Sequence, residues 1–334
     1  MNRNNMIFCT LFDSGYLDKG LALYHSMKQV MNEFKLYVFA FDDMTETILK
    51  EMDLSEVIVI NIENIETDEM RAVKKERSKA EYCWTTTPTV IEHVLSAYNE
   101  EICTYLDADL YFFSSPSVLF EEMETSNSSI IITEHRFPTK NIERNIKDNG
   151  KYCVQFNTFL NDNNGRKALS WWKEKTIESC YYSRKGEVKG DQKYLESFVE
   201  LFDGVHELQH LGGGVAPWNI CKYSLKDEKN MIFLEDEHNF KLIFYHFQNI
   251  RYLPFGYVNI KSSIKDKKMR NLIYFPYLSL VETIRFQLKN DFGIAFTIKK
   301  SYYKNPILKF IQNYIMPFKL RTLKDIISLR KVRK

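Results

Sequence analysis

Two acidic residues, Asp107 and Asp109, stand one residue apart inside the apolar run Tyr105–Phe113. The segment Ile102–Phe113 has the length and composition of a buried strand that leads into a second short strand. Burial of an unpaired carboxylate costs several kcal/mol, and two carboxylates this close also repel each other. A hard divalent cation with oxygen ligands would neutralise both. The alternative is a β-turn in which one Asp caps the chain and the other faces water, but the apolar flanks favour a metal site.

Strand and helix signals alternate along the first 135 residues, which is typical of a parallel sheet covered by helices. The expected strands cover 6–12, 35–41, 56–62, 102–113 and 128–135, and the expected helices cover 16–31 and 44–52. A further helix is expected to begin at Thr87-Pro88, with Thr as the cap and Pro in the first helical position. Because ligands bind at the carboxyl ends of the strands in such sheets, the two acids lie where a site is expected.

The second half of the chain is more mixed. Here the sequence predicts strands over 152–160 and 241–252, helices over 165–180 and 190–202, and a glycine-rich loop over 210–219. Trp171 and Trp172 are expected on the core side of the first of these helices, and Asp191 at or near the N-cap of the second.

Polar residues also stand where other expected elements begin or end. They are Asn157, Asp191 with Gln192, Asn219 and His246. Each has a structural explanation: Asn157 could satisfy a strand edge, Asp191 could be only a helix cap, and His246 could be a hydrogen-bonded core histidine. For any one residue alone that explanation is the better one. Their shared placement favours a common site.

The charge of the chain is unevenly distributed. Residues 299–334 contain eleven Lys and Arg against one acid, whereas residues 1–298 carry 35 bases and 43 acids. Apolar residues recur at helical spacing in this tail, on either side of Pro317: Ile307, Leu308, Phe310, Ile311, Tyr314, Ile315, Leu320, Leu323, Ile326, Ile327 and Leu329. A basic amphipathic pattern predicts attachment to an anionic membrane surface, with packing of the apolar face on the body as the alternative. The acidic body argues against nucleic acid as a partner.

The six cysteines are scattered and show no metal-binding spacing; several stand in apolar runs, where a thiol behaves as a small buried hydrophobe. No signal-peptide pattern precedes the first expected strand, and no stretch of about 18 apolar residues is present. We therefore expect a cytoplasmic protein, peripheral at the inner face of the cell membrane if the tail binds lipid.

Five segments resemble, in order, those of nucleotide-sugar glycosyltransferases of the GT-A fold, and most of all glycosyltransferase family 8, the glycogenin and galactosyltransferase type. They are CTLFDSGY, YLDADL with its DxD motif, FNTFL, GDQKYL and YHF, within about residues 5–252. The segments EYCWTTTP and GGVAPWN also resemble a bacterial branch associated with surface-polysaccharide biosynthesis. The resemblance implies an α/β, Rossmann-like fold with a mostly parallel central sheet flanked by helices. The catalytic domain would cover residues 1–260, with a nucleotide-binding half over about 1–135 and a sugar and acceptor half over about 136–260, and a helical basic extension would cover 261–334.

The resemblance also implies roles for individual residues. Asp107, Asp109 and His246 would hold Mn²⁺ or Mg²⁺, which bridges the donor diphosphate. The other donor contacts would be Thr10, Phe12, Asp13 and Tyr16 at the base and ribose, Lys79 or the neighbouring Arg77, Ala108 between the acids, and Arg251 at the diphosphate. Asn157, Asp191 and Gln192 would line the sugar pocket and act in catalysis, with Asp191 orienting the donor hydroxyls.

The chain departs from the family pattern at two places. His246 is followed by Phe247-Gln248-Asn249-Ile250-Arg251, so the Gly and Lys usually found after this histidine are missing, and Thr158-Phe159 replaces the glycine that usually follows Phe-Asn. These differences indicate a divergent member of the clan.

The sequence therefore predicts a metal-dependent glycosyltransferase of the hexosyltransferase type (EC 2.4 class). We expect a UDP-sugar donor, a glycan or lipid-linked acceptor, and transfer with retention of configuration. The alternatives are a sugar nucleotidyltransferase and a non-catalytic, membrane-peripheral binding protein with a degenerate site.

Overall fold

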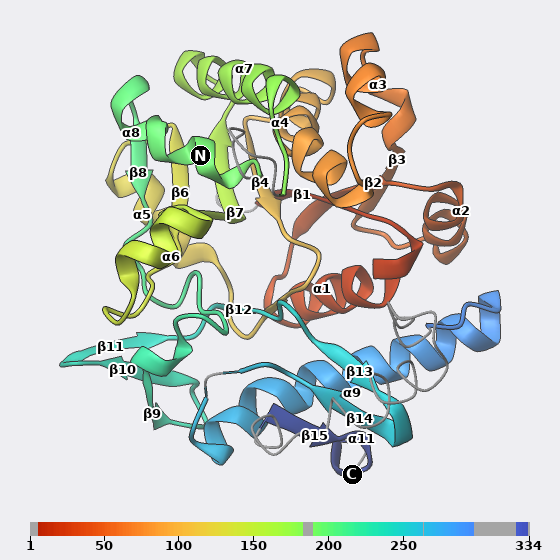
Figure 1. Cartoon of the computed structure of the whole chain (residues 1–334), viewed down its shortest axis with the longest axis vertical. Coiled ribbons are helices and arrows are strands. Elements are labelled where there is room, and N and C mark those ends of the chain that lie inside the picture. The colour runs from red at the N-terminus through yellow and green to blue at the C-terminus, as the bar shows by residue number, and fades with distance from the viewer. Residues whose placement is uncertain (1–5, 183–189, 263, 297–324, 333–334) are drawn as a thin grey trace.

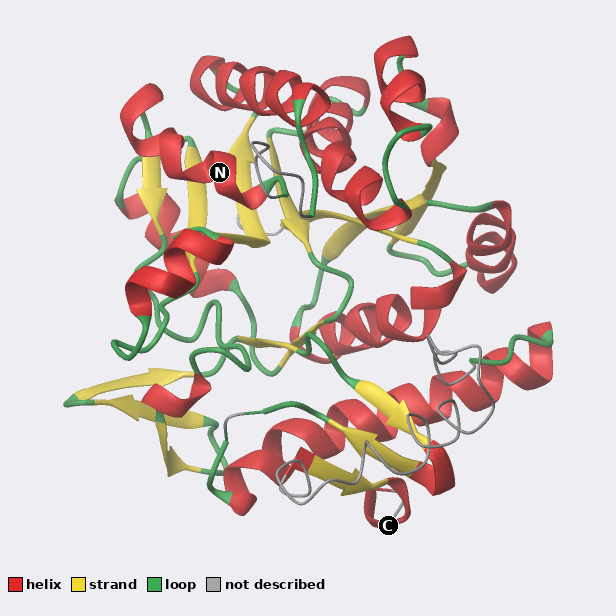
Figure 2. Cartoon of the chain, viewed as in Figure 1, coloured by secondary structure: helices red, strands yellow, loops and turns green. Residues whose placement is uncertain are grey.

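The computed structural model describes residues 6–182, 190–262, 264–296 and 325–332 of the 334-residue chain. Its centre is a seven-stranded sheet with the order β3-β2-β1-β4-β7-β6-β8 (Figures 1 and 2). The strands are Met6–Phe12 (β1), Phe34–Ala40 (β2), Val57–Asn61 (β3), Ile102–Leu106 (β4), Ile130–Glu134 (β6), Tyr152–Leu160 (β7) and Val205–Glu207 (β8). Within this sheet β7 alone runs against the other strands. The prediction of an α/β fold with a mostly parallel central sheet is confirmed.

Helices cover both sides of the sheet. The described helices are Leu17–Val30 (α1), Asp43–Met52 (α2), Asp68–Lys74 (α3), Lys79–Ala97 (α4), Ser117–Thr125 (α5), Ile142–Asn149 (α6), Asn163–Glu178 (α7), Phe198–Leu201 (α8), Lys267–Phe292 (α9) and Leu329–Val332 (α11). In Figure 1, α4 and α7 lie above the sheet, and α1 and α9 lie below it. Because both faces are covered, nearly every residue of β1, β2 and β4 is buried, and these strands are apolar without alternation.

The helix expected to begin at Thr87-Pro88 begins earlier, at Lys79, so this prediction is wrong. Ser78 caps α4 in a capping box: its hydroxyl accepts from the backbone N–H of Glu81, and the Glu81 carboxylate accepts from the backbone N–H of Ser78. Pro88 lies in the interior of the helix. The capping box satisfies the first N–H groups of the helix at residue 78, and the Thr-Pro pair therefore does not mark its start.

The helix expected over 190–202 is divided into a 3-10 segment, Gln192–Ser197 (η3), and the short α8. Asp191 does occupy the N-cap position of η3, but its side chain makes no capping bond. Trp172 of α7 is fully buried, as predicted, and its indole N–H donates to the Asp191 carbonyl at 3.0 Å. Trp171 is only partly buried and packs against the rings of Tyr194 and Phe198.

The strand expected over 241–252 is also divided. Phe244–His246 (β12) pairs with Leu110–Phe112 (β5), and Arg251–Leu253 (β13) belongs to a different sheet. Between them Asn249 adopts a left-handed backbone with φ of 64°, a conformation that Asn tolerates and that breaks a strand.

Two small antiparallel sheets complete the described chain. One contains Ser224–Asp227 (β9), Ile232–Glu235 (β10) and His238–Lys241 (β11); the other contains β13, Tyr257–Asn259 (β14) and Ile326–Ser328 (β15). Ile326 and Ile327 thus lie in a strand paired with β14, so the prediction of a helix at these two residues is wrong. The helical pattern expected over 307–323 lies outside the described residues. None of the helices in the described ranges combines the length and apolar character that crossing a bilayer requires.

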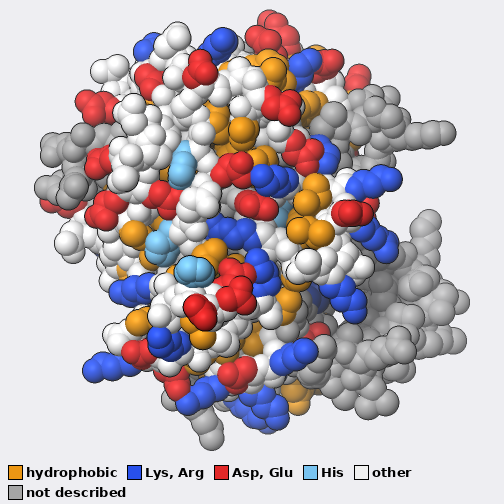
Figure 3. Space-filling model, turned by 90° about the vertical axis from the view of Figure 1, so that its left-hand side faces the viewer, with side chains coloured by type: hydrophobic (Ala, Val, Ile, Leu, Met, Phe, Trp, Pro, Cys, Tyr) orange, Lys and Arg blue, Asp and Glu red, His pale blue; other side chains and the backbone are white. Residues whose placement is uncertain are grey.

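Charged side chains of both signs are interspersed on the face of the molecule shown in Figure 3. Lys and Arg alternate with Asp and Glu over this surface, and histidines stand among them.

Candidate functional site

The two acids lie in the turn between β4 and β5, at the carboxyl end of a central strand. The backbone N–H of Asp107 donates to the Gln155 carbonyl of β7 at 3.1 Å, and the N–H of Leu110 closes the turn on the Asp107 carbonyl at 3.2 Å. β5 then pairs with β12 in a register that sets His246 opposite Leu110. This pairing brings a histidine from far along the chain beside both acids.

The His246 imidazole lies between the acids and Gln155. Its Nε2 is 2.9 Å from Asp109 Oδ1 and 3.7 Å from Asp107 Oδ2. Its Nδ1 is 2.8 Å from Gln155 Oε1, an oxygen that can only accept. A proton held on Nδ1 leaves Nε2 as the nitrogen available to a metal. Gln155 thus orients the ring, a role that our sequence interpretation missed.

The positive charge of His246 compensates the two carboxylates unequally. Burial opposes ionisation of Asp109, yet the adjacent His246 imidazolium holds the pKa of Asp109 below its usual value. Burial likewise opposes protonation of His246, but the charges of Asp109 and Asp107 raise its pKa well above the usual value. For Asp107 burial dominates over the attraction of His246, and its pKa is raised to about 6. One imidazolium therefore compensates one carboxylate and leaves the other costly to ionise.

A divalent cation fits this donor set. Two carboxylates and a neutral imidazole are ligands that Mn²⁺ and Mg²⁺-type sites accept, and a charge of +2 would balance both acids where the imidazolium balances one. The side chain of Asp107 is 29% exposed, that of Asp109 13% and that of His246 5%. A cation would therefore reach the three residues from the side of Asp107.

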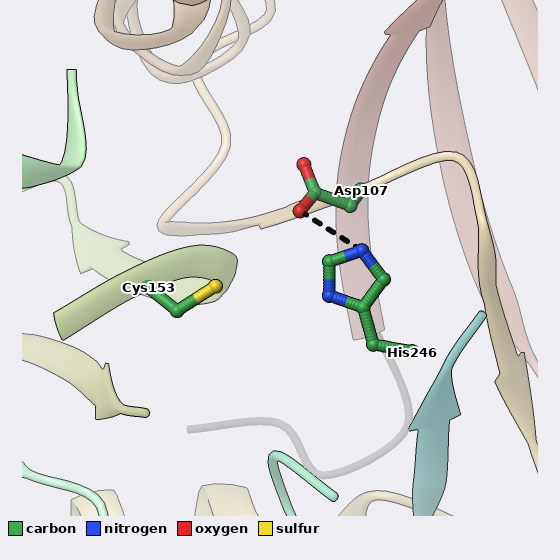
Figure 4. A group of neighbouring side chains, drawn as sticks. All are labelled: Asp107, Cys153 and His246. Atoms are coloured by element: carbon green, nitrogen blue, oxygen red, sulfur yellow. Dashed lines mark ion pairs between the residues drawn. The ribbon is translucent and has the colours of Figure 1, made fainter. Parts of the chain in front are cut away.

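Cys153 of β7 lies beside this group. One ligand atom each from Asp107, Cys153 and His246 can be chosen so that all lie within 4.8 Å of one another. Figure 4 shows the Cys153 sulfur directed towards the imidazole from one side, with the Asp107 carboxylate above the ring nitrogen to which the dashed line joins it. Sequence reasoning treated the cysteines as core residues. A signal was available, because Cys153 and Gln155 stand two residues apart in the expected strand, the spacing of side chains that share one face.

Of the residues predicted for the sugar pocket, Asp191 lies near enough to Asp107 to feel its charge. Asp191 is 4% exposed; burial raises its pKa to about 7 against a hydrogen bond with Thr87, and the charge of Asp107 raises it further. Asn157 is fully buried, and its Oδ1 accepts from the Thr133 N–H at 3.1 Å. Its Nδ2 has no hydrogen-bond partner within the described part of the chain. Gln192 instead donates to the Asn149 carbonyl, at the end of α6.

The residues predicted for the nucleotide lie at the end of β1. Thr10 is buried, and no described residue bonds its hydroxyl. The Asp13 carboxylate pairs with Lys79, whose Nζ is also 3.7 Å from Asp42 Oδ2. Phe12 is buried against Gly20, a position where a Cβ would collide with its ring.

Tyr16 connects this side to the acids. It is 45% exposed, and the charge of Asp109, followed by burial, raises the pKa of its phenol well above the usual value. The Lys19 ammonium lies over its ring at 3.5 Å. Lys19 also lowers the pKa of Asp109 after the larger effects of burial and His246. Lys19 was missed by the sequence interpretation, although its charge acts on Asp109.

Two predicted basic residues are not brought to this group. The Arg77 guanidinium is buried and donates to the Thr85 hydroxyl and to the carbonyls of Thr176 and Ile177, which ties α4 to the end of α7. Arg251 is exposed at the start of β13, in a separate sheet. Ala108 is buried between the two acids.

The departure at Thr158-Phe159 has a structural explanation, and so has the buried Asn219. The Thr158 hydroxyl bonds the Thr104 hydroxyl at 2.8 Å inside the sheet, and Phe159 stacks on Trp172. Asn219 is buried and holds the glycine-rich loop, because its amide donates to the carbonyls of His135 and Gly214.

Trp218 in that loop packs edge-on against the His246 ring, with centroids 5.3 Å apart. Its indole N–H donates to the His135 carbonyl at 2.9 Å, which fixes the ring in place. The loop therefore packs Trp218 against the His246 ring and helps to hold that ring in place.

Comparison with solved structures returned proteins of low sequence identity. Mouse xyloside xylosyltransferase 1 matches 73% of this chain and 98% of its own, with a TM-score of 0.47 and 12% identity. An active-site mutant of LgtC matches 73% of this chain and 88% of its own, with a TM-score of 0.48 and 9% identity. GlyE of Streptococcus pneumoniae TIGR4 matches 64% of this chain and 47% of its own, with a TM-score of 0.41 and 13% identity.

Comparison with curated sequences found two relatives in Bacillus subtilis (strain 168), both described as uncharacterized proteins. YfnD is 29% identical over 276 residues, which cover 81% of this chain and 87% of YfnD. YfnF is 32% identical over 251 residues, which cover 73% of this chain and 81% of YfnF. No protein-family model matches. By this identity and coverage, the chain belongs to the family of the Bacillus subtilis protein YfnF.

Proposed function

We propose that this protein is a metal-dependent glycosyltransferase that moves a sugar from a UDP-sugar to a glycan or lipid-linked acceptor, with retention of configuration. The observation that carries the proposal is the convergence of Asp107, Asp109 and His246 at the carboxyl end of β4. In an α/β sheet this edge is where ligands bind. The nucleotide residues at the end of the neighbouring β1 lie on the same edge.

Asp107, Asp109 and His246 would hold the cation, which neutralises charge on the departing nucleoside diphosphate when it is bound. Tyr16 and Asp13 would contact the base and ribose from the end of β1, with Lys79 holding Asp13. In a retaining transfer the acceptor hydroxyl would lose its proton to the leaving phosphate, so no protein base is required at that position.

Asp191 and Asn157 would hold the donor sugar. Asp191 has a pKa of about 7, raised mainly by burial, so near neutral pH its carboxylate form is available to accept from sugar hydroxyls. The Asn157 Nδ2, which no described residue bonds, is a buried donor that a sugar oxygen would satisfy. Both features are those of a pocket built for a polar ligand.

The alternative of a sugar nucleotidyltransferase calls for a glycine-rich, basic phosphate loop after the first strand. Here the segment after β1 holds Asp13, whose carboxylate faces Lys79, followed by the single turn Ser14–Tyr16 (η1). The segment therefore lacks the glycine-rich, basic character of such a loop. Non-catalytic binding remains an outcome of the test below.

Titration calorimetry of UDP with and without Mn²⁺ tests the proposal. We expect binding that needs the cation and that weakens by at least about tenfold in Asp109→Asn, because the variant loses a direct ligand. Asp203→Asn, at an exposed acid, is the matched control and should bind as the parent does. Hydrolysis of a panel of UDP-sugars in the same buffer separates an enzyme from a binding protein. UDP binding that is unchanged by chelation would refute the metal role.

The acceptor and location form part of the same proposal. A lipid-linked acceptor would meet the enzyme at the inner face of the cell membrane, and the basic tail would supply the attachment. The tail's charge comes from the sequence, since most of this segment lies outside the described residues.

A further inference from the structure

Cys153 has no part in the proposed transfer, yet it lies beside Asp107 and His246. β7 carries it to this place: the N–H of Asp107 bonds the Gln155 carbonyl, and Gln155 is the next residue along β7 on the same face as Cys153. The thiol is 4% exposed and forms no disulfide. A buried thiol beside an imidazole and a carboxylate differs chemically from one in an apolar core, because all three groups can share a cation.

The donor atoms are close enough for direct coordination. The ligand atoms of Asp107, Cys153 and His246 lie within 4.8 Å of one another. Ligands bound tetrahedrally to Zn²⁺ at about 2.0–2.3 Å stand about 3.3–3.5 Å apart. Small rotations of the three side chains would therefore close the distance. The proton on Nδ1, held by Gln155, leaves His246 Nε2 free to coordinate once its contact with Asp109 is exchanged for the metal.

This ligand set differs chemically from the set of Asp107, Asp109 and His246 that we propose for the cation used in transfer. Carboxylates and waters suit Mg²⁺ and Mn²⁺, whereas a thiolate selects softer cations such as Zn²⁺, Co²⁺ or Cd²⁺. Asp109 completes the first set and Cys153 completes the second. Asp107 and His246 belong to both, so the two cations cannot be bound together.

We propose that Asp107, Cys153 and His246 form a second, sulfur-containing site that binds a thiophilic divalent cation of the Zn²⁺ type and excludes the cation used in transfer. Binding replaces the thiol proton with the metal and releases that proton to solvent. Asp107, the most exposed of the three at 29%, provides the entry side. The enzyme would consequently lose activity when free Zn²⁺ rises. The site stands on its own donors, and only its inhibitory effect rests on the proposed function.

Co²⁺ is the probe that reports sulfur coordination directly. Added to the full chain, it should produce the near-ultraviolet charge-transfer band of a cobalt–thiolate bond, and one equivalent of Zn²⁺ should remove that band. Cys153→Ser should lose the band and weaken Co²⁺ binding by at least about tenfold, since loss of a direct ligand exceeds the effect of second-shell changes. Cys221→Ser, at an exposed thiol, is the matched control and should keep the band. Asp109→Asn should keep it too.

The outcomes separate this site from the proposed function. A parent protein that binds Co²⁺, seen by its visible d–d bands, without a thiolate band overturns the sulfur site, whatever the variants do. A thiolate band that survives in folded Cys153→Ser overturns the assignment to Cys153. UDP that fails to bind with Mn²⁺ while the thiolate band appears refutes only the donor proposal. Release of bound Mn²⁺ by one equivalent of Zn²⁺, followed by electron paramagnetic resonance, confirms the overlap, and retained Mn²⁺ refutes it.

Discussion

Asp191→Asn should change how the stability of this protein depends on pH. Asp191 is 4% exposed, and burial raises its pKa from 3.8 to about 7 against a hydrogen bond with Thr87. Asn has the same shape and can keep that hydrogen bond through its amide, but it never ionises. The bond from the Trp172 indole goes to the backbone carbonyl of residue 191 and survives the substitution.

The size of the effect follows from the two pKa values. The unfolded chain releases the proton near pH 4, whereas the folded chain holds it to about pH 7. Between these values the folded state binds more protons, so stability falls as pH rises. The interval from 3.8 to about 7 corresponds to about 4 kcal/mol at most, at about 1.4 kcal/mol per pH unit. Between pH 4 and pH 8 the free energy of unfolding of the parent should therefore fall by up to this amount more than that of Asp191→Asn.

Urea unfolding in the presence of a chelator, at pH 4, 6 and 8, measures the difference. Asp191→Asn should gain stability over the parent progressively as pH rises, with a gain of a few kcal/mol at pH 8. Asp203→Asn, at an exposed acid, is the control and should run parallel to the parent. Unfolding free energies of parent and Asp191→Asn that stay parallel within about 0.5 kcal/mol would refute the burial argument. The proposed sugar contact also predicts that Asp191→Asn loses transfer.

Three further predictions concern the metal histidine, the α4 cap and the tail. Gln155→Leu should weaken Mn²⁺ binding about 10- to 100-fold by releasing the His246 ring, and Gln155→Glu should restore it; equal affinity in the leucine variant, by paramagnetic resonance titration, would contradict this. Ser78→Ala should lower the free energy of unfolding by about 1 kcal/mol, and an unchanged urea midpoint would show that the capping box does not start the helix. Triple reversal of Lys309, Lys319 and Arg321 to Glu should weaken binding to anionic vesicles by at least about 100-fold, because loss of the three positive charges alone, at about 1 kcal/mol each, gives that factor. The same reversal at the exposed Lys167, Lys229 and Lys241 is its control, and equal losses would refute a specific tail contact. Because β15 pairs with β14, substitution is a cleaner test than deletion of residues 305–334.

Much of the fold could be predicted from local patterns. Six of the seven strands of the central sheet appear close to their expected bounds because apolar runs with turn residues at both ends are local signals; the short β8 was not predicted. Errors arose where two local signals competed, as at Thr87-Pro88, where the capping box at Ser78 starts the helix upstream. The division of 241–252 depends on one left-handed residue, Asn249, which apolar composition does not reveal.

By itself, the sequence indicated that two acids stand at the end of an apolar strand and favoured a positive charge that neutralises them. Only the tertiary structure decided which groups do so. The β5–β12 register brings His246 to Asp109, and β7 adds Gln155 and Cys153. Arg77, by contrast, donates its hydrogen bonds to backbone carbonyls at the end of α7. The physical reason is that burial cost is a property of a local segment, whereas its compensation depends on strand pairing between residues far apart in the chain.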